Sequence, residues 1–214
     1  MLRLVLSLVA LLGLAACGAQ PVWAPEDQVQ SARFVSEEPA YITLYTVINK
    51  SSGSGAHSAI LVNGSERLIF DPAGTWHHPR LPERNDVHFG MTDKALAFYI
   101  DYHARKTYDV IEQKIYVSPA VAEQVLAKVK AYGAVPKAMC TNATSGILRT
   151  VPGFESMPAT WYPKKLSDAF GQLPGVEERL ITDDDDDSNH GVLLVQANGN
   201  PLESYGAADI VGMA

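Results

Sequence analysis

The sequence predicts an α+β domain in which an antiparallel sheet packs against helices. Short runs rich in β-branched and aromatic residues are joined by tight turn signals, which is typical of neighbouring antiparallel strands. Segments with apolar residues at helical spacing lie between and after these runs, and they begin at capping residues. This succession indicates a mixed architecture around one core. Residues 40–214 are enough for a single domain with a sizeable core.

Five runs predict strands: residues 41–48, 57–62, 67–71, 108–117 and 190–197. Residues 63–66, NGSE, separate the second run from the third, and their Asn63-Gly64 dipeptide is typical of a β-hairpin. The fourth run alternates between apolar and polar residues, as a half-buried strand does. The last run, HGVLLVQA, is apolar, and we expect it to add a strand at the edge of the sheet.

Three segments predict helices. The first follows Thr92, which we expect to be its N-cap. The second has Ser118 as its cap, Pro119 in its first turn and Gly133 just beyond its end. The third, CTNATSGIL, is short and begins at Cys140, which places this cysteine at a helix N-terminus.

The N-terminal residues predict export. Residues 1–16 have the pattern of a secretory signal peptide, with a positive charge, an apolar run and small residues. The letters LAAC resemble a bacterial lipobox, which implies lipidation of Cys17; ordinary cleavage nearby, with Cys17 unmodified, is the alternative. Gly18 favours the outer membrane, facing the periplasm. Residues 17–39 are polar and predict a tether from the lipid, which is the expected contact with the membrane.

The charge pattern bears on ligands and partners. The net charge is −7, and it becomes −8 without the signal peptide, so nucleic acid is not an expected partner. The sequence has no HExxH motif and no paired Cys/His ligands, so we expect neither a metal site nor a cofactor. The acidic run at residues 183–187 has carboxylates that could bind calcium, but it lacks the glycine and glutamate of an EF-hand. A solvated acidic loop is the simpler interpretation.

Cys140 is the residue whose chemistry needs explaining. If Cys17 carries lipid, Cys140 is the one free thiol, and such a thiol is either buried and inert or reactive. A nucleophilic thiol needs a helix N-terminus or a histidine to help it lose its proton. His57 opens an apolar strand after a glycine-serine loop and is the best candidate for that histidine.

Asp71 ends the neighbouring strand. A three-residue hairpin loop would pair His57 with Asp71 on one face of the sheet, whereas a loop of two or four residues would separate them. A turn residue before Pro72 is the alternative interpretation of Asp71.

The order of these features resembles the circularly permuted papain-like hydrolases, which include permuted NlpC-type peptidases and lecithin retinol acyltransferase relatives. The matching segments are GAHSAILV, LIFDPAG and the helical stretch that ends in CTNATSGIL, within residues 41–150. The resemblance implies that Cys140 is the nucleophile, His57 the general base and Asp71 the orienting group. Some relatives have histidine as the third residue, so His77 or His78 could take the place of Asp71.

These features predict a thiol-dependent amide hydrolase that works through an acyl-enzyme, with peptidoglycan stem peptides as the substrate. Trp76 follows DPAGT and is the expected substrate-binding residue, with core packing as its alternative role. A lipid or thioester acyl hydrolase or acyltransferase would use the same residues. A non-catalytic binding or assembly lipoprotein is the other alternative, and Met139 favours it because many relatives carry Asn or Asp there.

Overall fold

The computed structural model describes residues 18–202. The predicted signal peptide, the predicted lipidation site Cys17 and residues 203–214 lie outside the described residues. Within the described part, no helix is both long enough and apolar enough to cross a membrane.

A seven-stranded antiparallel sheet forms the centre of the described fold, with the strand order β4-β5-β3-β2-β1-β6-β7. The strands are β1 (Tyr41–Asn49), β2 (Gly55–Asn63), β3 (Arg67–Phe70), β4 (Glu83–Arg84), β5 (Val87–Phe89), β6 (Tyr108–Tyr116) and β7 (Glu177–Ile181). The prediction of an α+β domain with an antiparallel sheet is confirmed at this level.

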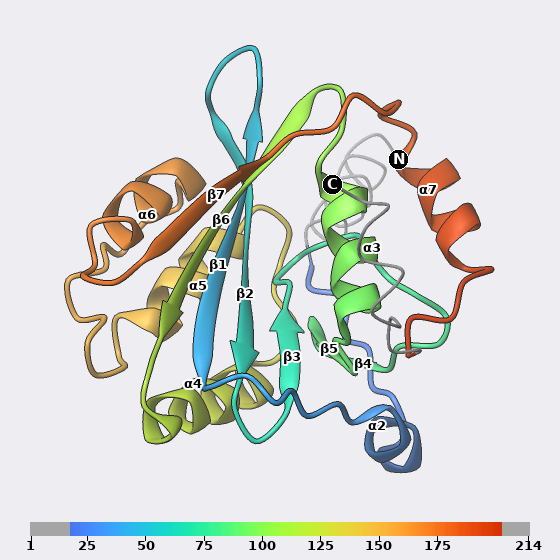
Figure 1. Cartoon of the computed structure of the whole chain (residues 1–214), viewed down its shortest axis with the longest axis horizontal. Coiled ribbons are helices and arrows are strands. Elements are labelled where there is room, and N and C mark those ends of the chain that lie inside the picture. Colours follow the sequence, from blue (N-terminus) through green and yellow to red (C-terminus); the bar gives the residue numbers. More distant parts are fainter. Residues whose placement is uncertain (1–17, 203–214) are drawn as a thin grey trace, which may run out of the picture.

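Six helices accompany the sheet within residues 18–202: α2 (Glu26–Ala32), α3 (Asp93–His103), α4 (Pro119–Tyr132), α5 (Cys140–Leu148), α6 (Pro163–Phe170) and α7 (Asn189–Gln196). Helices α3 and α7 lie on one face of the sheet, and α4, α5 and α6 lie on the other (Figure 1). The predicted caps are confirmed, since the side chains of Thr92 and Ser118 accept hydrogen bonds from the first turns of α3 and α4. Gly133 ends α4 with a φ of 89°.

Both faces of the central strands are buried. In β1 and β2 the even-numbered apolar residues, such as Leu44 and Ile60, pack against α4, α5 and α6. The odd-numbered ones, such as Tyr45 and Leu61, pack against α3. This explains why these strands read as nearly continuous apolar runs instead of alternating ones.

The hairpin between β2 and β3 decides which side chains meet. Asn63 pairs with Arg67, so the loop has three residues, 64–66. Of the loop lengths that the sequence left open, three residues is the right one, but the three-residue alternative placed the loop one position earlier, at 63–65, which shifts the register by two. Because side chains alternate with a period of two, an even shift leaves His57 and Asp71 on the same face.

The segment that the sequence predicts as a tether packs on the sheet over part of its length. The backbone N–H of Ala24 donates to Glu83 O and that of Arg67 donates to Phe34 O, each at 2.9 Å. Helix α2 buries Val29 and Ala32. Residues 24–34 therefore belong to the folded unit. Their polar composition does not indicate this, because only one side of the short helix α2 packs against the rest of the protein.

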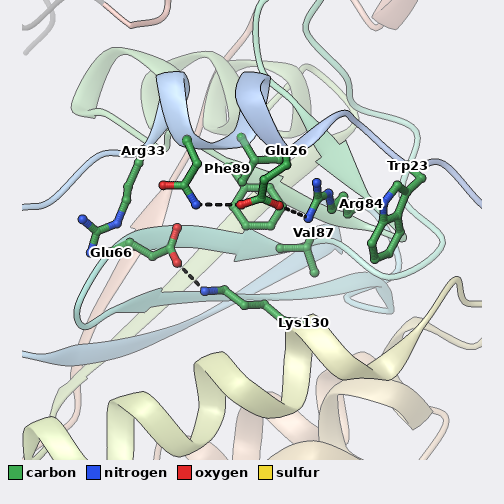
Figure 2. A pocket seen from close by; sticks show the side chains of 10 residues that line it. Trp23, Glu26, Arg33, Glu66, Arg84, Val87, Phe89 and Lys130 are labelled. Carbon is green, nitrogen blue, oxygen red and sulfur yellow. Dashed lines mark hydrogen bonds and ion pairs between the residues drawn. The ribbon is translucent and has the colours of Figure 1, made fainter.

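Helix α2 also closes a pocket of about 290 Å³ against β5 and α4. Figure 2 shows two ion pairs among its charged groups, Arg84 with Glu26 and Lys130 with Glu66. Arg33 also lines the pocket, and its guanidinium donates to Ser65 O. Phe89 contributes to its apolar lining. Because each of these charged groups already has a partner in the protein, we interpret the pocket as a packing junction that holds α2.

The predicted strand at residues 190–197 is wrong, because this segment forms helix α7. Ser188 caps the helix through Gly191 N, and Val192 and Leu193 pack against the core that α3 covers. The edge next to β6 is occupied by β7 instead. The sequence does not reveal β7, because its residues are mostly exposed and carry no apolar run.

Candidate active site

The sheet is open at the point where α5 begins. Strand β3 pairs with β2 only over Ile60–Asn63, so residues 55–59 of β2 extend past the end of β3. Helix α5 starts at Cys140 and packs beside β2, where Thr141 Oγ1 lies 3.2 Å from Ser58 Oγ. This opening lets a thiol from one face of the sheet reach a histidine whose neighbours lie on the other face.

Cys140 is 7% exposed and sits among polar groups. Its Sγ accepts a hydrogen bond from the backbone N–H of Ser58, contacts the His57 ring and lies 3.7 Å from Thr141 Oγ1. Burial by itself would raise the pKa of the thiol, but His57, Thr141 and Ser58 outweigh it and lower that pKa. The cysteine is therefore in a setting that favours the thiolate.

His57 lies between Cys140 and Asp71. Its Nε2 is 2.5 Å from Asp71 Oδ1, which leaves Nδ1 as the ring nitrogen for the thiol. Burial lowers the pKa of His57, but the Asp71 carboxylate and Cys140 outweigh burial and raise it to about 10. Burial would likewise raise the pKa of Asp71, and His57 instead holds it well below its usual range. The structure thus brings together the three residues that the sequence predicts as a triad.

Asp71 is fixed by its own neighbours. The buried Tyr99 hydroxyl donates to Asp71 Oδ1 at 2.9 Å, and Asp71 N donates to Asp86 O at 2.8 Å. Gly74 crosses so close to the carboxylate that a Cβ there would lie 1.8 Å from Asp71 Oδ2. Asp71 Oδ2 has no hydrogen-bond partner among the described residues. One oxygen of this carboxylate is therefore shared by two donors, and the other is unused.

His103, at the end of α3, lies beside this group. Its ring stacks on that of His57 with centroids 5.7 Å apart and planes 4° from parallel. Its Nδ1 is 2.8 Å from the backbone oxygen of Tyr99, one turn earlier. Burial lowers the pKa of His103 to about 4, so it is neutral near pH 7.

Asp86 ties together the two loops that approach the site. Its carboxylate accepts the backbone N–H of Val135 at 2.7 Å and also that of Ala73. Burial raises its pKa to about 6. Ala73 and Ala138 have φ values of 57° and 66°, a left-handed conformation that non-glycine residues seldom adopt. The backbone is thus held in unfavourable conformations close to Asp71 and just before Cys140.

Two cavities share the loop at residues 73–75. One, of about 210 Å³, is bordered by His57, His103 and Tyr108. The other, of about 360 Å³, is lined by Asp71 and by other charged and polar side chains, including Glu83 and Lys137. A ligand held across this loop would therefore lie beside the triad.

The other predicted site residues have different surroundings. His78 Nε2 is 2.9 Å from Gln196 O and its Nδ1 accepts from Arg80 N, while His77 is exposed, so neither stands beside His57. Trp76 is 2% exposed, and its Nε1 donates to Gln196 Oε1 at 3.2 Å. Its ring forms edge contacts with Tyr99 and borders the larger cavity. Its place in the core matches the packing role that we gave as the alternative to substrate binding.

The acidic run is mostly exposed, as a solvated loop should be, and it is also anchored to the fold. Asp187 accepts hydrogen bonds from both the backbone and the hydroxyl of Thr107. Arg105 lies 3.4 Å from Asp185, and Lys50 donates to Asp183 O. These contacts pair part of the run with cations and fix it beside the start of β6.

The comparisons with known proteins do not assign the chain to a family. No family model, curated protein or solved structure matches it. The interpretation of the site therefore depends on its own geometry. Sequence reasoning missed Tyr99, His103 and Asp86. The spacing of Tyr99 and His103, four residues apart on a predicted helix, could have marked one polar face, whereas Asp86 reads only as a turn residue.

Proposed function

We propose that this chain is a thiol-dependent acyl hydrolase of the cell envelope that cleaves amide bonds. The observation that carries the proposal is the chain of contacts from Cys140 through His57 to Asp71. A nucleophile, a base and a group that orients the base are the parts such chemistry requires. The order of these residues also supports our proposal of a permuted papain-like fold.

In the proposed reaction, His57 takes the proton of Cys140 and the thiolate attacks the substrate carbonyl carbon, forming a C–S bond. The backbone N–H of Cys140, at the first turn of α5, is the proposed donor to the oxyanion. The C–N bond then breaks and His57 gives its proton to the departing amine. Water attacks the thioester with His57 as base, releasing a carboxylic acid and restoring the thiol.

We propose peptidoglycan stem peptides as the substrate. The larger cavity beside the triad is lined by charged side chains, including Glu83, Asp86 and Lys137. Such a lining suits a peptide with charged ends better than the apolar tail of a lipid. The predicted signal peptide and lipid site at Cys17 support an outer-membrane location facing the periplasm, where this substrate is found.

The first test measures the reactivity of the Cys140 thiol. In a Cys17→Ser variant Cys140 is the sole cysteine, so the rate of iodoacetamide labelling reports on it alone. With a chelator present and at a pH well below the free-thiol pKa of about 8.5, we expect fast labelling that falls at least about tenfold in His57→Gln. His78→Gln, another buried histidine, is the control and should label normally. A rate equal to that of a small thiol, or no labelling until unfolding, would overturn the proposal in favour of a binding module.

The second test measures the reaction. Purified muropeptides are incubated with the protein, and the products are identified by mass spectrometry. We expect a new amine and a new carboxylic acid, with Cys140→Ala inactive. Cleavage of acyl lipids or thioesters but not muropeptides would replace the amide substrate by the lipid alternative.

The location has its own test. Fractionation of cells should place the protein with the outer membrane, and Cys17→Ser should release it into the periplasm. A Cys17→Ser protein that stays on the membrane would contradict lipid anchoring.

A further inference from the structure

We propose that His57, Asp71 and His103 form a binding site for a divalent transition-metal ion of the zinc class, and that the ion switches the thiol off. One ligand atom from each residue lies within 4.8 Å of the others. Two imidazoles and one carboxylate are a donor set that zinc and cobalt accept, with a further position left for water. The sequence does not show this set, because the three residues come from β2, the end of β3 and α3.

The hydrogen bond at Nδ1 of His103 orients its ring so that Nε2 can be a metal ligand. Its Nδ1 is 2.8 Å from Tyr99 O, which fixes the proton on Nδ1 and leaves a lone pair on Nε2. A backbone carbonyl that orients a histidine in this way is the usual arrangement around a bound metal. No hydrogen bond from the described residues occupies Nε2, so this nitrogen is available to an ion.

An unpartnered oxygen of Asp71 is independent evidence for a bound ligand. The residue is 1% exposed, and Oδ2 has no hydrogen-bond partner among the described residues. A buried carboxylate oxygen without a partner is costly unless something binds it. A metal ion would use this oxygen while Tyr99 continues to hold Oδ1.

The cavity beside the two histidines gives the ion access. It has a volume of about 210 Å³ and is bordered by both His57 and His103. The ion would bind His57 Nε2, the nitrogen that lies 2.5 Å from Asp71 Oδ1, and the proton of neutral His57 would move to Nδ1, the nitrogen that faces the thiol. A metal-bound His57 cannot accept the proton of Cys140, so thiol activation would stop. The binding itself is independent of the proposed function, whereas the inhibition depends on it.

The experiment uses cobalt chloride as the probe, with absorption of the metal-depleted full chain read in the visible range. The Cys17→Ser, Cys140→Ala double variant is titrated first, so that no thiol contributes to the spectrum. We expect the bands of four-coordinate cobalt, and an affinity at least about tenfold weaker in His103→Gln. Asp71→Asn is a second variant with the same expectation, and His78→Gln is the matched control. Thermal melts confirm that each variant is folded.

Absence of cobalt binding to the Cys17→Ser, Cys140→Ala protein, or binding that is unchanged when His103→Gln and Asp71→Asn are each added to it, overturns the site. The regulatory part is tested on Cys17→Ser by labelling Cys140 with and without zinc. We expect zinc to slow labelling, and to do so at least tenfold less effectively in His103→Gln. Binding without slower labelling overturns the inhibition, and slow labelling with or without zinc refutes the proposed function while leaving the metal site standing.

Discussion

Replacing Tyr99 by phenylalanine removes one buried hydroxyl from the site and leaves the ring in place. That hydroxyl donates to Asp71 Oδ1 at 2.9 Å, and the residue is 1% exposed. A hydrogen bond to a charged group contributes about 1.5–3 kcal/mol to folding stability. The phenylalanine keeps the packing of the ring against Trp76 and His103. We therefore expect Tyr99→Phe to lower the free energy of unfolding by about 1.5–3 kcal/mol.

Urea denaturation measures this change, and Tyr102→Phe is its control. The Tyr102 hydroxyl lies 2.9 Å from the neutral Thr75 hydroxyl, and a neutral bond contributes only about 0.5–1.5 kcal/mol. For a chain of this size the Tyr99 variant should melt about 3 to 12 °C lower. Labelling of Cys140 should also slow, because Asp71 would hold His57 less firmly. If Tyr99→Phe lowers the free energy of unfolding by less than about 0.5 kcal/mol, or by no more than Tyr102→Phe does, the hydrogen bond from Tyr99 to a charged Asp71 is refuted.

Three further substitutions test the surroundings of the site. In Gly74→Ala the new Cβ would lie 1.8 Å from Asp71 Oδ2, so we expect a lower melting temperature and a slower rate of Cys140 labelling. In Gln196→Ala the Trp76 N–H loses its acceptor, so we expect α7 to be cleaved faster in limited proteolysis. In Thr141→Val the hydroxyl 3.7 Å from the Cys140 sulfur is removed, so labelling of Cys140 should slow several-fold, and stability should fall because the buried Ser58 hydroxyl loses its partner.

Each of these three substitutions has a matched control variant. Gly146 in α5 has nothing within 4 Å of a Cβ, so Gly146→Ala should be tolerated or raise stability by up to about 1 kcal/mol. Asn198→Ala also removes a side-chain amide near the end of α7, but its bond to Leu194 O is exposed, so proteolysis should change little. Thr144→Val removes a hydroxyl that bonds only to Cys140 O, so labelling should stay near normal. Equal effects within any pair would contradict the specific contact proposed for it.

Local signals in the sequence were sufficient for most elements near the site. Thr92, Ser118 and Gly133 mark helix ends through hydrogen bonds or backbone angles that involve only neighbouring residues. The relation of His57 to Asp71 depended on the length of a short hairpin, which the sequence left open. The three-residue alternative predicted it, and an error of two in the register did not alter it because side chains alternate with a period of two. Residues 190–197 were misread because a short apolar run suits a strand or a helix equally, and the edge it would have joined is taken by β7.

The sequence by itself determined the α+β class, the helix that begins at Cys140 and the strand that carries His57, because turns, caps and apolar runs act over a few residues. Only the tertiary structure decided that Cys140 reaches His57, since this depends on β3 ending before the first half of β2 is covered. It alone brought Tyr99 and His103 to Asp71, because α3 packs on the face of the sheet that these two residues share with His57. Contacts between elements far apart in the chain arise from packing, and no local pattern records them.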